Sequence, residues 1–240
     1  MDTETRLIVA LDVDEFQKAK KIVQALYPTV KIFKVGSTLF TACGPEIIKA
    51  INDKGARVFL DLKFHDIPST VAGAVESAAR HRVYMLTVHA IGGSHMVREA
   101  VQAAQRAGQV RPQILGVTVL TSMNDNDLKD IGVSRSAEEE VVHLARLAKE
   151  AGADGVVASA AEILPLRRAL GKNFIIVTPG IRPSGSSRGD QKRVATPAAA
   201  IASGADYIVM GRPIIEAADP AGAARQILKE IQDADARRNS

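Results

Sequence analysis

The sequence predicts a single-domain α/β protein, a (β/α)8 TIM barrel that spans residues 1–240. Three observations support this fold. Eight short apolar runs recur along the chain, Ala-rich amphipathic segments separate them, and polar residues repeatedly follow the apolar runs. Eight strands that alternate with helices in about this length are typical of this barrel.

Each predicted strand is rich in β-branched residues and nearly continuous in its apolar character. Parallel strands that are covered on both faces have this pattern. In chain order the predicted strands are LIVALD (7–12), IFKVG (32–36), RVFLDLK (57–63), YMLTVHA (84–90), QILGVTVL (113–120), GVVASA (155–160), FIIVTPG (174–180) and YIVMGR (207–212).

The segments between the strands are amphipathic and rich in alanine, which predicts helices. Examples are the segments 69–81, 94–108 and 136–153, and several such segments end at a glycine. A doubly wound open sheet is the competing fold. It usually has fewer strands and requires a Gly-rich turn after the first strand, whereas this chain has LDVDEF there. No linker or low-complexity tract divides the sequence, so we expect one domain.

The composition is that of an ordinary globular protein, and its mildly positive net charge suits anionic ligands. Hydrophobic residues make up 46% and charged residues 24%, with a formal net charge of +4. The basic residues are scattered and aromatic residues make up only 4%, so nucleic acid is not an expected partner. The sequence has no signal-peptide pattern, no apolar run that could cross a bilayer, and a single cysteine, Cys43, to which we assign no role. We therefore expect a cytoplasmic protein without a membrane partner.

Polar side chains stand at or just after the ends of the predicted strands. In a barrel all these positions meet at one end, where catalysis takes place. Their recurrence is a more specific signal than any single member of the set. The residues are Asp12, Lys34, Asp61, Lys63, His89, Thr121, Ser122, Arg182, Gly211 and Arg212.

The third predicted strand ends in charges of both signs. Asp61 and Lys63 are two residues apart, so the alternation of side chains along a strand places both on one face, toward the barrel mouth. Lys34 lies on the neighbouring strand, on the same face as Ile32 and Gly36. The predicted result is a carboxylate between two ammonium groups in a partly dry pocket. Buried charges are costly unless paired, and such a cluster in a pocket favours a role in function.

Each of these residues also has a purely structural interpretation. Asp66 precedes IPS and could cap the next helix, and Lys34 could form a structural ion pair with Asp61. His65 and His89 are expected to be ordinary polar or core residues, because no further residues at metal-ligand spacing accompany them. We therefore expect no metal site.

The end of the eighth predicted strand has the features of a phosphate site. In such barrels, phosphate groups commonly bind at the loops after strands seven and eight. Gly211 permits close approach of the backbone, and Arg212 offers a bidentate cation. The loop 180–193, GIRPSGSSRGDQKR, is typical of a solvated loop but also of a lid that closes over a bound ligand. The residues alone thus predict a barrel enzyme that binds a phosphorylated anion and performs acid–base chemistry.

The segment DLKFHDIPST (61–70) resembles the D-x-K-x-x-D-I-P-x-T signature of the orotidine 5′-phosphate decarboxylase family. Further segments, in the same order, resemble the bacterial form of that family: ALDV, FKVG, VTVLTSM, TPGIRP with GDQKR, and GADYIVMGRPI. Together they cover essentially the whole chain. The D-x-K-x-x-D part alone is shared with sugar-phosphate relatives.

The resemblance implies decarboxylation of orotidine 5′-monophosphate to uridine 5′-monophosphate in de novo pyrimidine biosynthesis, without a cofactor. Lys63 would protonate the carbanion left at C6 of the pyrimidine, and Asp61 would lie near the leaving carboxylate. A homodimer is implied, in which Asp66 and Thr70 reach the site of the partner subunit. Lys34, Asp61, Lys63 and Asp66 would then form an array of alternating charge.

The resemblance also implies roles in substrate binding. These roles divide among the ribose, the pyrimidine and the phosphate. Asp12, Lys34 and Thr70 would contact ribose hydroxyls, Thr121 and Ser122 would lie at the pyrimidine, and Arg182, Gln191, Gly211 and Arg212 would hold the phosphate, with Gln191 bridging from the lid toward the base.

Two other functions remain open. A sugar-phosphate lyase such as 3-keto-L-gulonate 6-phosphate decarboxylase or hexulose phosphate synthase shares the scaffold but uses a metal ion. Such an enzyme is expected to have glycine and a further acid after the second aspartate, whereas IPST follows Asp66 here. The other function is a non-catalytic phosphate-binding barrel that serves as a regulator, which would not need Lys63.

Overall fold

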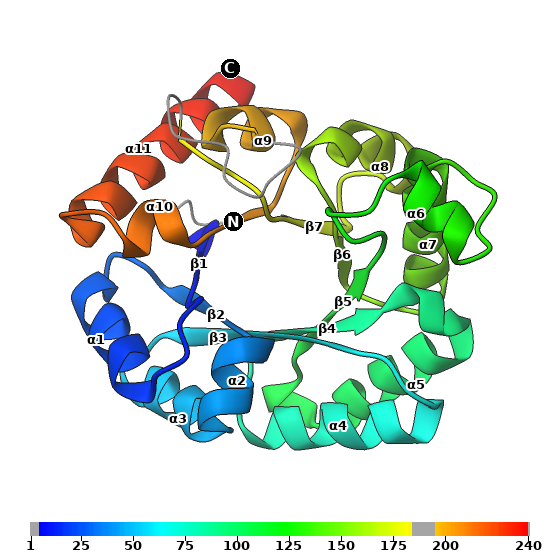
Figure 1. Cartoon of the computed structure of the whole chain (residues 1–240), viewed down its shortest axis with the longest axis horizontal. Coiled ribbons are helices and arrows are strands. Elements are labelled where there is room, and N and C mark those ends of the chain that lie inside the picture. Colours follow the sequence, from blue (N-terminus) through cyan, green and yellow to red (C-terminus); the bar gives the residue numbers. More distant parts are fainter. Residues whose placement is uncertain (1–4, 184–194, 240) are drawn as a thin grey trace.

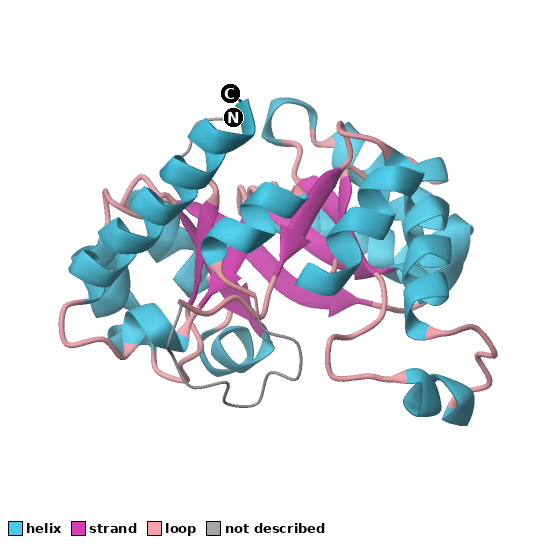
Figure 2. Ribbon diagram, turned by 90° about the horizontal axis from the view of Figure 1, so that it is seen from above, coloured by secondary structure: helices cyan, strands magenta, loops and turns pink. Residues whose placement is uncertain are grey.

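The computed structural model describes residues 5–183 and 195–239, with side chains described as far as residue 236. Eight parallel strands close into a barrel in which each strand pairs with its sequence neighbours and β8 pairs with β1. A ring of helices surrounds the strands when the molecule is viewed down the barrel (Figure 1), and the side view shows the strands enclosed between helices (Figure 2). The predicted (β/α)8 barrel is therefore confirmed.

Each strand overlaps one predicted apolar run. Most runs extend beyond the strand that they contain, because apolar character continues after the hydrogen-bonded ladder ends; Leu11 and Val119, for example, are buried beyond the ends of their strands. The strands are β1 (Leu7–Ala10), β2 (Ile32–Gly36), β3 (Arg57–Phe64), β4 (Met85–His89), β5 (Gln113–Val117), β6 (Gly155–Val157), β7 (Ile175–Thr178) and β8 (Tyr207–Met210).

The helices include the three segments singled out in the sequence, which form α4, α5 and α7. None of the helices in the described ranges is both long and apolar enough to span a membrane. The helices are α1 (Phe16–Leu26), α2 (Ser37–Cys43), α3 (Glu46–Asp53), α4 (Pro68–Arg80), α5 (Gly93–Arg106), α6 (Asp125–Asp130), α7 (Ala137–Glu150), α8 (Ile163–Leu170), α9 (Pro197–Ser203), α10 (Arg212–Ile215) and α11 (Pro220–Asn239), with short 3-10 turns at Ala90–Gly92, Gly108–Val110 and Ala160–Glu162.

The core has two layers, one inside the barrel and one between the barrel and the helices. Ile8, Ile32, Phe59 and Val177 belong to the inner cluster, whereas their neighbours along the strands pack outward against the helices. This alternation explains why the strand sequences are continuously apolar. It also means that the residues just beyond the inner layer, at the carboxyl ends of the strands, point into the barrel mouth.

Strand β3 departs from regular pairing near its end. Leu60 pairs with Leu86 of β4, and the next paired residue is Phe64 with Val88, so the register shifts between them. Lys63, in this β-bulge, has a φ of 52°, a left-handed conformation that is uncommon for a residue with a side chain. Asp61 and Lys63 both reach the barrel mouth, as predicted. However, the β-bulge, and not the regular alternation of side chains along a strand, determines the direction of the Lys63 side chain.

The amino-terminal end of the barrel is closed by polar contacts. The hydroxyls of Tyr84 and Tyr207 lie 2.9 Å apart, and burial raises the pKa of the Tyr207 phenol. Arginine–aspartate pairs surround this end, each joining a helix or loop to the start of a strand. They are Arg6 with Asp235, Arg111 with Asp154 and Arg167 with Asp206.

Candidate active site

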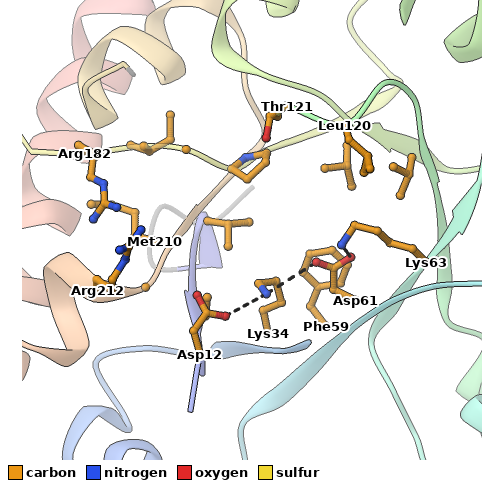
Figure 3. Close-up of a pocket in the computed structure, with 18 of the residues that line it drawn as sticks. Asp12, Lys34, Phe59, Asp61, Lys63, Leu120, Thr121, Arg182, Met210 and Arg212 are labelled. Carbon is orange, nitrogen blue, oxygen red and sulfur yellow. Dashed lines mark hydrogen bonds and ion pairs between the residues drawn. The ribbon is translucent and has the colours of Figure 1, made fainter. Parts of the chain in front are cut away.

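A pocket of about 250 Å³ opens at the carboxyl ends of the strands. Residues that follow or end seven of the eight strands line it, and the charged members of this lining are drawn in Figure 3. This is the end at which barrels place functional side chains. The charged lining residues are Asp12, Lys34, Asp61, Lys63, Arg182 and Arg212.

Four of these charges form a continuous chain along one side of the pocket. Lys34 Nζ lies 3.4 Å from Asp12 Oδ1 and 3.7 Å from Asp61 Oδ2, and Lys63 Nζ donates to Asp61 Oδ1 at 3.0 Å. The Asp61 and Lys34 side chains are only 13% and 15% exposed, so their charges interact in a largely dry environment. The predicted carboxylate between two ammonium groups is present.

Local backbone geometry makes room for this chain of charges. Lys34 and Gly36 lie on β2, and a Cβ added at Gly36 would come within 3.1 Å of Lys34 Nζ. Asp61 and Lys63 occupy the bulge of β3. Glycine at position 36 thus leaves the volume that the Lys34 ammonium group occupies.

Two arginines lie at the other end of the pocket from Lys63. Figure 3 shows Arg182 and Arg212 directed toward the same region, opposite the Lys63–Asp61 pair. The backbone N–H of Arg182 donates to the carbonyl of Ala195 at 3.0 Å, which fixes the base of the loop after β7. A Cβ at Gly211 would stand 3.0 Å from Asp12 Oδ2, so glycine permits β8 to end close to β1.

Apolar side chains complete the pocket on the side of the barrel interior. Phe59, Val117, Val157 and Val209 line it beneath the charged residues. Apolar walls exclude water and lower the local dielectric constant, which strengthens the electrostatic interactions of the charges above them.

The pocket carries an excess of positive charge. Its described lining contains four cationic side chains and two carboxylates. His89 stands near Lys63, and burial lowers the pKa of its imidazole, with a further lowering from His65 and Lys63. The surplus of positive charge in the pocket lining suits an anionic ligand.

The other predicted site residues lie in different places. Thr121 lines the pocket, whereas Ser122 is exposed and lies outside the lining. Asp66 and Thr70 are exposed, outside the pocket of their own chain, and Gln191 lies outside the described residues. The carboxylate of Asp66 accepts from the N–H of Ile67, at 2.6 Å, but Ile67 is the N-cap of α4 and no side chain caps this helix. The helix-cap interpretation of Asp66 is therefore wrong.

Sequence reasoning missed Thr87. This residue of β4 is fully buried, accepts a hydrogen bond from the N–H of Lys63 and donates one to Asp61. The signal was a single hydroxyl in the apolar run MLTVH, two residues before His89 and therefore on the inward face. Only the bulge of β3, which the sequence did not predict, brings that hydroxyl to Lys63.

Comparison with known protein families decides the identity of this scaffold. The model of the orotidine 5′-phosphate decarboxylase / HUMPS family matches residues 5–227. The chain belongs to this family. The match covers every strand and both ends of the charged pocket, from Asp12 to Arg212.

Individual members of the family are similar over nearly the whole chain. The orotidine 5′-phosphate decarboxylase of Moorella thermoacetica is 50% identical over 97% of this chain and 94% of its own length. That of Syntrophotalea carbinolica is 50% identical over 96% of both chains. The crystal structure of the Lactobacillus acidophilus orotidine 5′-phosphate decarboxylase has a TM-score of 0.86 and 39% identity, and the alignment covers 95% of this chain and 99% of that one.

The family name covers more than one activity, so it matters whether side chains of the site could bind a metal ion. Among residues 5–183 and 195–236, no group of three or more His, Cys, Asp or Glu side chains is arranged to hold a metal ion. Of the acidic residues in the pocket, Asp12 and Asp61 are both paired with lysine ammonium groups.

Proposed function

We propose that the chain decarboxylates orotidine 5′-monophosphate to uridine 5′-monophosphate, with Lys63 as the proton donor. Membership of the family and relatives of that activity at 50% identity support the reaction. The observation that carries the assignment of roles is the Lys34–Asp61–Lys63 chain, which shares one pocket with a pair of arginines.

The substrate is proposed to lie across the pocket with its two anionic groups at opposite ends. Arg182 and Arg212 bind the phosphate, next to the close approach at Gly211. Asp12 and Lys34, which lie between the two ends, bind the ribose hydroxyls. The pyrimidine then reaches Lys63, with Thr121 at its edge, while Ser122 and Gln191 stay predictions for the pyrimidine and the lid.

The reaction requires the pocket to stabilise a carbanion. The bond between C6 and the carboxylate breaks, carbon dioxide leaves, and the electron pair stays on C6. The Lys63 ammonium group stabilises that charge and then transfers a proton to C6, after which solvent returns a proton to Lys63. Asp61 orients Lys63 through the 3.0 Å hydrogen bond, and it lies beside the carboxylate that leaves.

The active form is proposed to be a homodimer that shares its sites. In the single chain Asp66 and Thr70 are exposed, as are the apolar side chains of Ile67 and Ile91, at 64% and 45%. A two-fold interface over this face would cover both apolar side chains and lend each Asp66 to the partner's charged chain. The array would then alternate through four charges.

A direct assay tests the reaction. Orotidine 5′-monophosphate is incubated with the purified chain, and its loss of absorbance is followed with and without EDTA. The expected result is the same rate of decarboxylation in both conditions. Decarboxylation that persists in EDTA would exclude the metal-dependent sugar-phosphate lyase, and binding of the nucleotide without turnover would support a non-catalytic phosphate-binding barrel.

A further inference from the structure

We infer that Thr87 of β4 is a positioning residue, whose hydroxyl holds Lys63 and Asp61 in their reactive orientation. This inference rests on the proposed function, because it assumes that Lys63 is the proton donor. Thr87 is fully buried beneath the pocket and is not part of its lining, so it acts through the two residues that it contacts.

The bulge of β3 lies opposite Thr87. Leu60 pairs with Leu86 and Phe64 pairs with Val88, so the segment 61–63 stands opposite the single residue Thr87. A bulge takes residues out of the regular ladder, and their backbone N–H groups then need other acceptors. The N–H of Lys63 donates to Thr87 Oγ1 at 2.9 Å.

The conformation of Lys63 depends on such support. Its φ of 52° lies in the left-handed region, which disfavours residues with a Cβ and persists only where the surroundings hold it. A hydroxyl group on the facing strand supplies a fixed acceptor at that point. The hydrogen bond therefore sets the direction in which the Lys63 side chain leaves the backbone.

The same hydroxyl also fixes the counter-ion of Lys63. Thr87 Oγ1 donates to Asp61 Oδ1 at 3.0 Å, and this carboxylate oxygen also accepts from Lys63 Nζ at 3.0 Å. One oxygen atom thus connects the backbone of Lys63 with the carboxylate that orients its ammonium group. Both hydrogen-bonding capacities of the hydroxyl are used, one as acceptor and one as donor.

A proton donor loses effect when it is displaced by even a fraction of an ångström. Without the hydroxyl, the bulge loses an acceptor and Asp61 loses a donor. The phosphate end of the pocket, at Arg182 and Arg212, does not depend on this contact. We therefore expect the loss to appear in kcat and not in KM.

The test compares Thr87→Val with a matched variant, Thr178→Val. Thr178 is also a fully buried strand threonine, but its hydroxyl has no hydrogen-bond partner among the described residues. Thr87→Val should lower kcat roughly ten- to a hundredfold with KM within about twofold of wild type, as expected for a lost hydrogen bond to a charged group. Thr178→Val should leave kcat unchanged, and Thr87→Ser, which keeps the hydroxyl, should restore most of the rate.

A graded series keeps the inference testable if Thr87→Val does not fold. Thr87→Cys keeps a side chain of similar size with a weaker donor and acceptor, so its kcat should fall severalfold below that of Thr87→Ser. Equal kcat for the Ser and Cys variants, or a normal kcat in folded Thr87→Val, would overturn the inference. Wild-type turnover of orotidine 5′-monophosphate tests the proposed function separately, because the function fails only if wild type is inactive.

Discussion

Acidic and basic side chains gather at both ends of the barrel, but they are balanced differently. At the amino-terminal end, Arg111 and Arg167 pair with Asp154 and Asp206, and each of these carboxylates also accepts a backbone N–H from the neighbouring strand. At the carboxyl-terminal end, the described pocket lining holds four cations and two carboxylates around an open volume. The paired charges at the amino-terminal end stabilise the fold, whereas the surplus charge around the cavity at the carboxyl-terminal end can bind a ligand.

The contrast extends to what each cation contacts. Arg167 donates to the carbonyls of Gly204 and Phe174 as well as to Asp206, so protein groups occupy its guanidinium. Lys63 contacts Asp61 and projects into the pocket. We therefore expect substitutions at the two ends to have opposite effects, on stability at one end and on catalysis at the other.

The largest expected effect is that of Lys63→Ala. Removing the ammonium group eliminates both proton transfer and charge stabilisation at C6, so kcat should fall roughly 10⁴-fold or more. The melting temperature should change little, because Asp61 keeps its contacts with Lys34 and Thr87. Lys49→Ala, at an exposed lysine of α3, is the matched control and should be fully active. Substantial turnover in folded Lys63→Ala would contradict the assignment.

The next largest effect is expected at the phosphate end. Binding energy from a remote phosphate can organise a distant site. Arg212→Ala should therefore raise the activation free energy by several kcal/mol, which lowers kcat/KM on the order of a hundred- to a thousandfold. Free phosphite added with a truncated nucleoside substrate should restore part of the rate in wild type. Arg106→Ala, at an exposed arginine paired with Glu76, serves as the control. A lack of activation by phosphite would argue against a lid that phosphate binding closes.

Arg167→Met should show the opposite behaviour at the amino-terminal end. The substitution leaves Asp206 without its guanidinium and several carbonyls without a donor, which should destabilise the fold by about 3 kcal/mol. The melting temperature should fall by roughly 6–12 °C, while kcat of the folded protein at 25 °C stays within about twofold of wild type. If Arg167→Met instead lowered kcat without changing the melting temperature, the division between the two ends would be wrong.

A smaller effect tests whether the carboxyl-terminal end is completed by a second chain. Lys63→Ala and Asp66→Asn are each expected to be inactive, but subunit exchange would create mixed dimers with one intact site. Random exchange makes half the dimers mixed, so activity should recover to roughly a quarter of wild type. If Asp66 acted within its own chain, every site would retain one defect, and activity would stay absent even with exchange confirmed independently.

The smallest expected effect concerns His89 and pH. The pKa of its imidazole is lowered in the folded protein, so below the ordinary value of 6.5 the unfolded chain binds more protons than the folded one. The free energy of unfolding should therefore decrease as the pH falls from about 6.5 toward the lowered pKa. His89→Gln should make this decline shallower when melting temperatures are compared between these pH values. Parallel curves for wild type and variant would show that His89 does not contribute.

The sequence by itself determined the barrel and most of the charged pocket. Eight apolar runs predicted eight strands because a parallel strand covered on both faces has few alternatives to a continuous apolar pattern. Asp12, Lys34, Arg182 and Arg212 were predicted to converge because the carboxyl ends of parallel barrel strands meet at one end. These conclusions depend on periodicity and order along the chain, which are local properties.

Only the tertiary structure determined the direction of the Lys63 side chain. Its direction depends on a register shift between β3 and β4 and on the hydroxyl of Thr87, and a bulge has little signature in the sequence of one strand. The structure likewise separated Thr121, in the lining, from Ser122, which is exposed beside it. The direction of Lys63 follows from a contact between residues distant in sequence, where packing and hydrogen bonding select one backbone geometry among several that the local sequence allows.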